Sequence, residues 1–168
     1  MSNHKPTVEQ RITRLEDIES ITRLKAEYAR KLDNHFDGDG LASLFVEDGI
    51  WTIKGVGGEA KGRDGIKHHC CNLRQSISWA QHNILSAIVD VSADGYRANA
   101  SFYLLCLLTM KASPNSPKEE AVVLSGKYSD KFIKIDGKWL IEEVSGVIEQ
   151  SAPWTQGWVA SQLVKESW

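Results

Sequence analysis

The chain has 168 residues, of which 42% are hydrophobic and 25% charged, and its formal net charge is −2. These values are ordinary for a globular protein and predict one domain, residues 1–168, with a sizeable core. The chain has no basic block, so we expect no nucleic-acid partner. The longest nearly apolar run, residues 102–110, is too short to cross a bilayer, so we also expect no membrane partner.

The cysteines and the first ten residues bear on location. Cys70 and Cys71 are adjacent, Cys106 lies far from them in the chain, and no CxxC pair occurs. This pattern is typical of reduced thiols rather than of a disulfide framework or a zinc site. The first ten residues contain no apolar segment of the kind that a secretory signal needs, so the sequence predicts a cytoplasmic protein.

The first predicted element is a long helix that Thr7 can cap. Apolar residues recur along it at steps of three and four, which marks one helical face. These residues are Val8, Ile12, Leu15, Ile18, Ile21, Leu24, Tyr28 and Leu32. A polar, glycine-containing segment ends the helix, and the next expected elements are a short helix at 41–45, a short strand at 50–54, a glycine-rich loop at 55–62 and a third helix at 63–77.

From residue 79 onwards the apolar pattern changes to a period of two. It predicts four long strands, at 79–92, 96–112, 121–135 and 138–150, joined by turns, of which Asp136-Gly137 is the strongest signal. The tail, 151–168, is expected to be partly helical. This order indicates an α+β fold in which three N-terminal helices pack on one face of a curved, mostly antiparallel sheet, and the sheet forms a cone-shaped barrel. The open end of the cone is a natural pocket for a ligand.

Asp33 and His82 are the candidate catalytic pair. A carboxylate beside a histidine fixes the tautomer of the ring and stabilises the imidazolium, which makes a general base. Spacing alone favours the other interpretation, a core or rim histidine with satisfied hydrogen bonds and a helix-end aspartate that faces water. Asp33 lies roughly 120° from the apolar stripe of its helix. The strand pattern leaves the facing of His82 open, because a bend is needed to bring it together with Ala87 on the inner face.

Other chemistry is poorly supported by the sequence. Asp33, His35 and Asp37 are close together at the end of a helix, where three ligands cannot easily converge on one metal ion, and no second cluster completes the set. His68 and His69 are adjacent, so their side chains diverge on a helix. No nucleotide-binding or nucleophile motif occurs. We therefore expect neither a metal nor a cofactor.

Four stretches resemble the SnoaL-like family, which has the cone-shaped fold of nuclear transport factor 2. They are "LEDIESITRLKAEYARKLDN", "FVEDGIWTIKG", "WAQHNIL" and "YSDKFIKIDGKWLIEE", and the similarity covers about residues 10–150. Within this superfamily the chain most resembles cofactor-independent lyases: bile acid 7α-dehydratase, scytalone dehydratase and hexachlorocyclohexane dehydrochlorinase. The resemblance implies that His82 is the base, that Asp33 orients it, and that Tyr28 donates a hydrogen bond to a substrate oxygen.

The resemblance also bears on the substrate. Several of these enzymes carry an arginine on the last strand, and "VSGVIEQ" has none, so we expect a neutral, largely aromatic or polycyclic small molecule. Five residues suit the pocket wall by position, although each also suits plain core: Trp51, Trp79, Phe102, Leu104 and Trp154.

Three functions are compatible with these observations. The best supported is a lyase, a dehydratase or a related elimination or deformylation enzyme. An isomerase or cyclase that uses the same base is the second, and a non-catalytic ligand-binding or assembly module is the third. The resemblance also leads us to expect a homo-oligomer, a trimer or a dimer, that forms through the outer face of the sheet.

Overall fold

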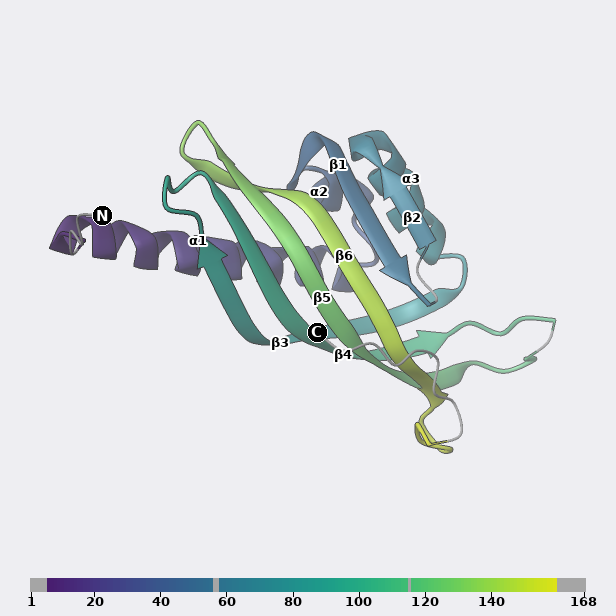
Figure 1. Cartoon of the computed structure of the whole chain (residues 1–168). Coiled ribbons are helices and arrows are strands. Elements are labelled where there is room, and N and C mark those ends of the chain that lie inside the picture. The colour runs from purple at the N-terminus through teal and green to yellow at the C-terminus, as the bar shows by residue number, and fades with distance from the viewer. Residues whose placement is uncertain (1–5, 56–57, 115, 160–168) are drawn as a thin grey trace.

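The structure, a computed structural model, describes residues 6–55, 58–114 and 116–159. The helices of the described residues all lie in the first half of the chain, and long strands make up the second half (Figure 1). The elements are α1 (Val8–Asp33), α2 (Gly38–Ala42), β1 (Phe45–Lys54), β2 (Gly58–Lys61), α3 (Gly62–Leu73), β3 (Ile77–Val91), β4 (Arg97–Met110), β5 (Glu120–Ile135) and β6 (Lys138–Pro153).

The strands form one curved sheet in the order β2-β1-β6-β5-β4-β3. β3, β4, β5 and β6 are an antiparallel meander, β2 pairs antiparallel with β1, and β1 pairs parallel with β6. Helix α1 packs against β3, and α3 packs against β1. The predicted α+β class and the mostly antiparallel sheet are confirmed. The expected barrel is wrong, because β2 and β3 are edge strands and the sheet does not close.

Strand β4 shows how the inner face is built. Phe102, Leu104 and Cys106 are buried, while the alternating Tyr103 and Leu105 are 45% and 39% exposed. Because side chains alternate across a strand, one face of β4 belongs to the core and the other forms the outer surface of the sheet.

Strand β3 contains the bend that the sequence required. The pairing of β3 with β4 shifts between Leu85 and Ile88, and Ser86 has φ of +53°. Before this bulge His82 and Ile84 face the inner side, and after it Val91 does. A bulge adds one residue to one strand, so even-numbered side chains face inwards before it and odd-numbered side chains face inwards after it.

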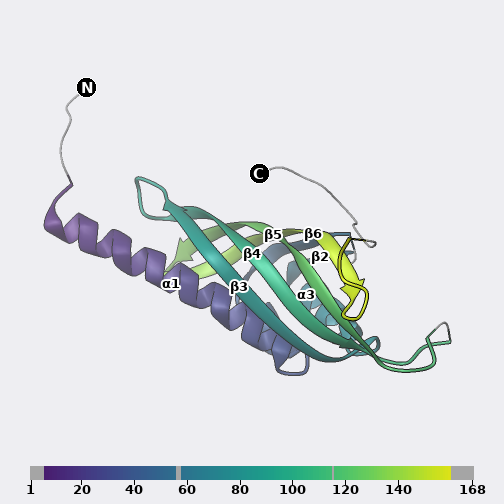
Figure 2. The same ribbon diagram turned by 90° about the horizontal axis from the view of Figure 1, so that it is seen from below.

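Helix α1 has the predicted bounds, and Thr7 caps it by accepting a hydrogen bond from the Gln10 N–H. Burial begins at Asp17, although the apolar steps begin at Val8. The first half extends past the sheet (Figures 1 and 2), and Val8, Ile12 and Leu15 are 68%, 50% and 66% exposed. An apolar periodicity indicates which face of a helix is apolar, but not how much of that face the rest of the protein covers.

Several other boundaries differ from the prediction, including the end of α3 at Leu73 rather than at residue 77. The short second helix lies at Gly38–Ala42 rather than 41–45, and β1 begins at Phe45 and so includes residues predicted to lie before it. Strand β2 occupies part of the expected glycine-rich loop. The tail continues as strand to Pro153 and then as turns to residue 159, and the expected helix beyond that point lies outside the described residues.

Candidate active site

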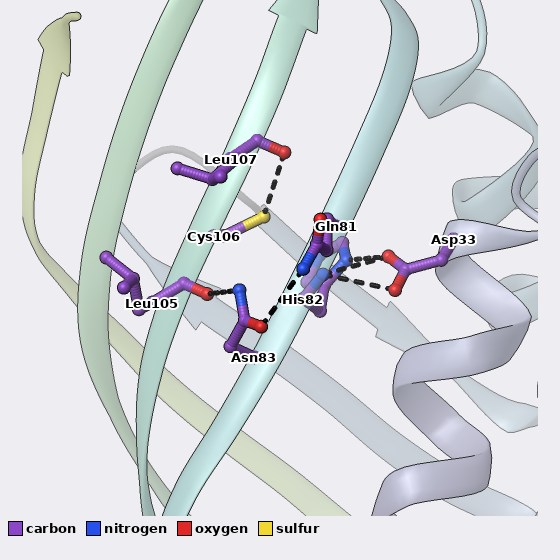
Figure 3. A network of polar contacts seen from close by, with 7 residues as sticks. All are labelled: Asp33, Gln81, His82, Asn83, Leu105, Cys106 and Leu107. Atoms are coloured by element: carbon purple, nitrogen blue, oxygen red, sulfur yellow. Dashed lines mark hydrogen bonds and ion pairs between the residues drawn. The ribbon is translucent and has the colours of Figure 1, made fainter.

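Asp33 and His82 are joined by hydrogen bonds across 49 positions of the chain. The ring Nδ1 of His82 lies 2.7 Å from Oδ1 of Asp33, and the backbone N–H of His82 donates to both carboxylate oxygens at 3.0 and 3.1 Å. Figure 3 shows Asp33 at the end of its helix, pointing at β3. The carboxylate therefore fixes both the backbone and the ring of His82.

Asp33 stands at an electrostatically unfavourable place. It is the last residue of α1, where the helix dipole disfavours a negative charge. Arg30 and Lys31 in the same turn and the two donors of His82 compensate. If the ring donates its Nδ1–H to Asp33, Nε2 is left without a proton and can accept one.

A cavity of about 450 Å³ lies between the helices and the inner face of the sheet, and His82 is part of its wall. The polar lining groups are few, and none is a lysine or an arginine. Apolar side chains make up most of the wall: Leu32, Phe36, Ile53, Leu73, Ile77, Leu104, Leu108, Met110, Val122, Leu124 and Ile148. Such a wall suits a neutral, hydrophobic ligand.

Tyr28 lines the same cavity from α1, one helical turn and one residue before Asp33. It is fully buried, and its hydroxyl accepts a hydrogen bond of 2.7 Å from Nε1 of Trp51. Burial raises the pKa of Tyr28, so the hydroxyl keeps its proton and can donate a hydrogen bond.

The five predicted wall residues divide into two groups. Trp51 and Leu104 line the cavity. Trp79 and Trp154 do not, because they are 50% and 65% exposed, and Phe102 is buried in the core instead. Those three assignments are corrected: Trp79 stands at an outward position of β3, Trp154 follows the end of β6, and the Phe102 ring packs 5.6 Å from Nζ of Lys25.

Two of the lining residues that the sequence did not indicate carry weakly acidic groups. Tyr128 on β5 and Cys106 on β4 both face the cavity, and Cys106 is the direct cross-strand partner of His82. Alternation along β4 and β5 could have indicated both. Burial raises the pKa of the Cys106 thiol to about 12, so this group stays neutral.

The acidic side chains at the end of α1 and just after it have partners within the protein. Asp33 binds His82, while Asp37 caps α2 by accepting from the Gly40 N–H and pairs with Lys31, and these contacts lower its pKa. Across residues 6–55, 58–114 and 116–159, no three His, Cys, Asp or Glu side chains gather around one point. Within the same residues, no helix has both the length and the apolar character needed to cross a bilayer.

A family comparison identifies the chain. Residues 13–145 match the SnoaL-like domain, so the protein belongs to the SnoaL-like family. No curated protein matches the chain.

Solved structures share its fold. A candidate scytalone dehydratase from Novosphingobium aromaticivorans is 21% identical with a TM-score of 0.74, over 92% of this chain and 97% of that one. A hexachlorocyclohexane dehydrochlorinase from Novosphingobium barchaimii is 18% identical with a TM-score of 0.74, over 92% and 99%. A protein with a cystatin-like fold, related to nuclear transport factor 2 and also from N. aromaticivorans, is 22% identical with a TM-score of 0.64, over 96% of both. At these identities the likeness establishes the fold alone.

Proposed function

We propose that this protein is a cofactor-independent lyase, a dehydratase or a related elimination or deformylation enzyme, in which His82 is the general base. One observation carries the proposal: the His82 ring is held by Asp33 at 2.7 Å and stands in the wall of a cavity of about 450 Å³. General-base catalysis by histidine requires this arrangement: a carboxylate holds one ring nitrogen, so that the other is free to accept a proton.

The proposed elimination uses three side chains. Nε2 of His82 removes a proton from a substrate carbon, the electron pair of that C–H bond forms the new double bond, and the bond to the leaving oxygen breaks. The proton on His82 can then depart with that oxygen as water. Asp33 stabilises the imidazolium in the interval, and Tyr28 donates a hydrogen bond to a substrate oxygen.

The cavity supports a neutral substrate of aromatic or polycyclic type. Its lining contains no lysine or arginine, so a carboxylate or phosphate group would have no cation to pair with. On the last strand, where related enzymes carry an arginine, Ile148 lines the cavity and Glu149 pairs with Lys127 at 2.8 Å. The neighbours named as a dehydratase and a dehydrochlorinase are consistent with this chemistry.

The test is a screen of neutral cyclic alcohols for loss of water, with mass spectrometry of the products. His82→Ala is expected to lower the rate by roughly 10²–10⁴-fold. His68→Ala, at an exposed position of α3, is the matched control and should leave the rate unchanged. A folded His82→Ala protein with full activity would show that His82 is not the base.

The same screen separates the alternatives. An isomerase or cyclase gives a product of unchanged mass, and His82→Ala then abolishes that reaction instead. A non-catalytic module binds members of the panel and converts none.

We also propose that the protein is a homo-oligomer, a trimer or a dimer. Leu85, Ile88, Tyr103 and Leu105 expose 39–64% of their surface on neighbouring strands β3 and β4. A contiguous apolar surface of this kind is typical of a protein interface. Light scattering on the purified protein tests the proposal, and Leu105→Lys should shift the mass towards that of a monomer.

A further inference from the structure

A lysine and an aspartate form an ion pair behind the cavity wall. Nζ of Lys25 on α1 lies 2.8 Å from Oδ2 of Asp130 on β5, and neither side chain is exposed to solvent. The Ser145 N–H donates to the other oxygen of Asp130 at 3.2 Å. Apart from the ion pair, neither Nζ nor Oδ2 has a hydrogen-bond partner among the described residues. The ammonium therefore keeps N–H groups that no acceptor uses.

Such a pair is costly to bury. Loss of hydration lowers the pKa of Lys25 and raises the pKa of Asp130, and the attraction between them opposes both shifts. Apolar side chains of similar volume often give equal or greater stability than a buried ion pair. The pair is therefore weak support for the fold by itself, and its surroundings indicate a different role.

The ammonium of Lys25 faces two aromatic rings of the cavity wall. Nζ lies 3.5 Å from the ring centre of Tyr128 and 4.1 Å from that of Tyr28. The two rings contact each other edge to face, with their centres 6.2 Å apart. A cation is attracted to the face of an aromatic ring, and this attraction grows when negative charge accumulates on the ring or its oxygen.

The hydroxyl groups of the two tyrosines carry two protons that a ligand oxygen can accept. The indole N–H of Trp51 can only donate, so Tyr28 accepts from it at 2.7 Å. The hydroxyls of Tyr28 and Tyr128 share a hydrogen bond, which uses one of their two protons. Both residues line the cavity, so a charged ligand oxygen that replaces this shared hydrogen bond can accept from both hydroxyls.

We propose that Tyr128 is a second ligand-binding hydroxyl that acts with Tyr28, and that Lys25 is a positioning residue which holds both rings and stabilises negative charge on the bound ligand oxygen. Asp130 keeps Lys25 in its charged form. This inference rests on the proposed function, because removal of a proton by His82 leaves a negative charge that an oxygen of the substrate must carry. It adds a site for that charge on the side of the cavity formed by β5.

Equilibrium binding tests the role of Tyr128. The probes are 4-nitrophenolate, at a pH where it is ionised in solution, and nitrobenzene, which has a similar shape and no charged oxygen. The ratio of their affinities is the readout. Tyr128→Phe keeps the ring and should lower the ratio by roughly tenfold or more, because it removes a hydrogen bond to a charged oxygen. Tyr96→Phe, at an exposed position outside the cavity, is the matched control. A folded Tyr128→Phe protein with the wild-type ratio would overturn the proposal for Tyr128.

The double variant Lys25→Met/Asp130→Asn tests the role of Lys25. It removes both charges, and the asparagine oxygen can still accept from the Ser145 N–H. We expect a lower ratio of phenolate to nitrobenzene affinity, whereas a purely structural pair would alter stability and leave the ratio unchanged. If the variant does not fold, the ¹⁵N resonance of the Lys25 ammonium in the wild-type protein provides the answer. It should shift when nitrophenolate binds and not when nitrobenzene binds, and equal responses would overturn the role.

These measurements need no turnover, so the inference and the proposed function can fail separately. A protein that prefers the phenolate through Tyr128 and eliminates nothing retains the inference and loses the proposed lyase activity. A protein in which His82→Ala abolishes an elimination, but Tyr128→Phe leaves the ratio unchanged, retains the lyase activity and loses the inference.

Discussion

Two ionisable pairs join α1 to the sheet, and their surroundings differ. Asp33 and His82 lie at the end of the helix, with 28% and 12% of their side chains exposed, and His82 borders the cavity. Lys25 and Asp130 lie deeper and have no exposed surface. The first pair can exchange a proton with a ligand or with water, whereas the second is closed to both. Partial exposure therefore suits chemistry, and complete burial suits a fixed charge.

This comparison predicts opposite effects of mutation. Changes at Asp33 should lower activity far more than stability, and changes at Lys25 should lower stability first. Four variants test this difference between activity and stability, in order of decreasing expected effect.

Asp33→Asn is expected to have the largest effect. An amide cannot hold the His82 ring with Nε2 free of its proton, so the elimination rate should fall by about 10³–10⁴-fold, the loss typical of this change in a catalytic triad. Stability should change by no more than about 1–2 kcal/mol. Asp90→Asn, at an exposed position of β3, is the control. ¹⁵N NMR of His82 reports the tautomer directly, and an unchanged tautomer together with an unchanged rate would contradict the pair.

Lys25→Met should have the next largest effect, on stability. It leaves the Asp130 carboxylate buried without a counter-charge, so unfolding in urea should become about 3–5 kcal/mol easier. A much smaller loss would mean that the pair is already partly neutral or hydrated.

Adding Asp130→Asn to Lys25→Met should recover part of this loss. The double variant has no unpaired buried charge, so it should be at least about 1 kcal/mol more stable than Lys25→Met alone. The same urea titration measures the difference. If the double variant instead lost the sum of what Lys25→Met and Asp130→Asn each lose alone, the two side chains would not interact.

Glu142→Gln should have the smallest effect. Arg97 and Glu142 are 2.8 Å apart on the surface, with 59% and 35% of their side chains exposed, so water screens their attraction. The expected loss of stability is far smaller than that of Lys25→Met. A loss as large as that of Lys25→Met would mean that burial does not set the strength of these pairs.

Much of the fold followed from local patterns. The capping residue Thr7 and the apolar steps gave the bounds of α1, and period-two alternation gave the four long strands to within a few residues. The short elements were less predictable. Strand β2 has four residues, and only its pairing with β1 makes it a strand.

The candidate site was predicted in part. Asp33, His82 and Tyr28 were selected by their chemistry and by a family resemblance. In the structure His82 and Tyr28 line the cavity, and Asp33 holds the ring of His82. Lys25 was missed, although its spacing of four from Ile21 and three from Tyr28 places it on the buried face of α1. A charged residue at such a position was a usable signal.

The sequence by itself determined the long elements, the class of fold and the residue types available for chemistry, because periodicity, capping and turn formation depend on neighbours along the chain. Only the tertiary structure decided which way His82 faces, since the bulge after Leu85 sets which alternate side chains of β3 face inwards. It also decided that Trp79 and Trp154 face outwards and that Lys25 meets Asp130 between two tyrosines. Those outcomes depend on contacts between segments distant in the chain, which local patterns do not encode.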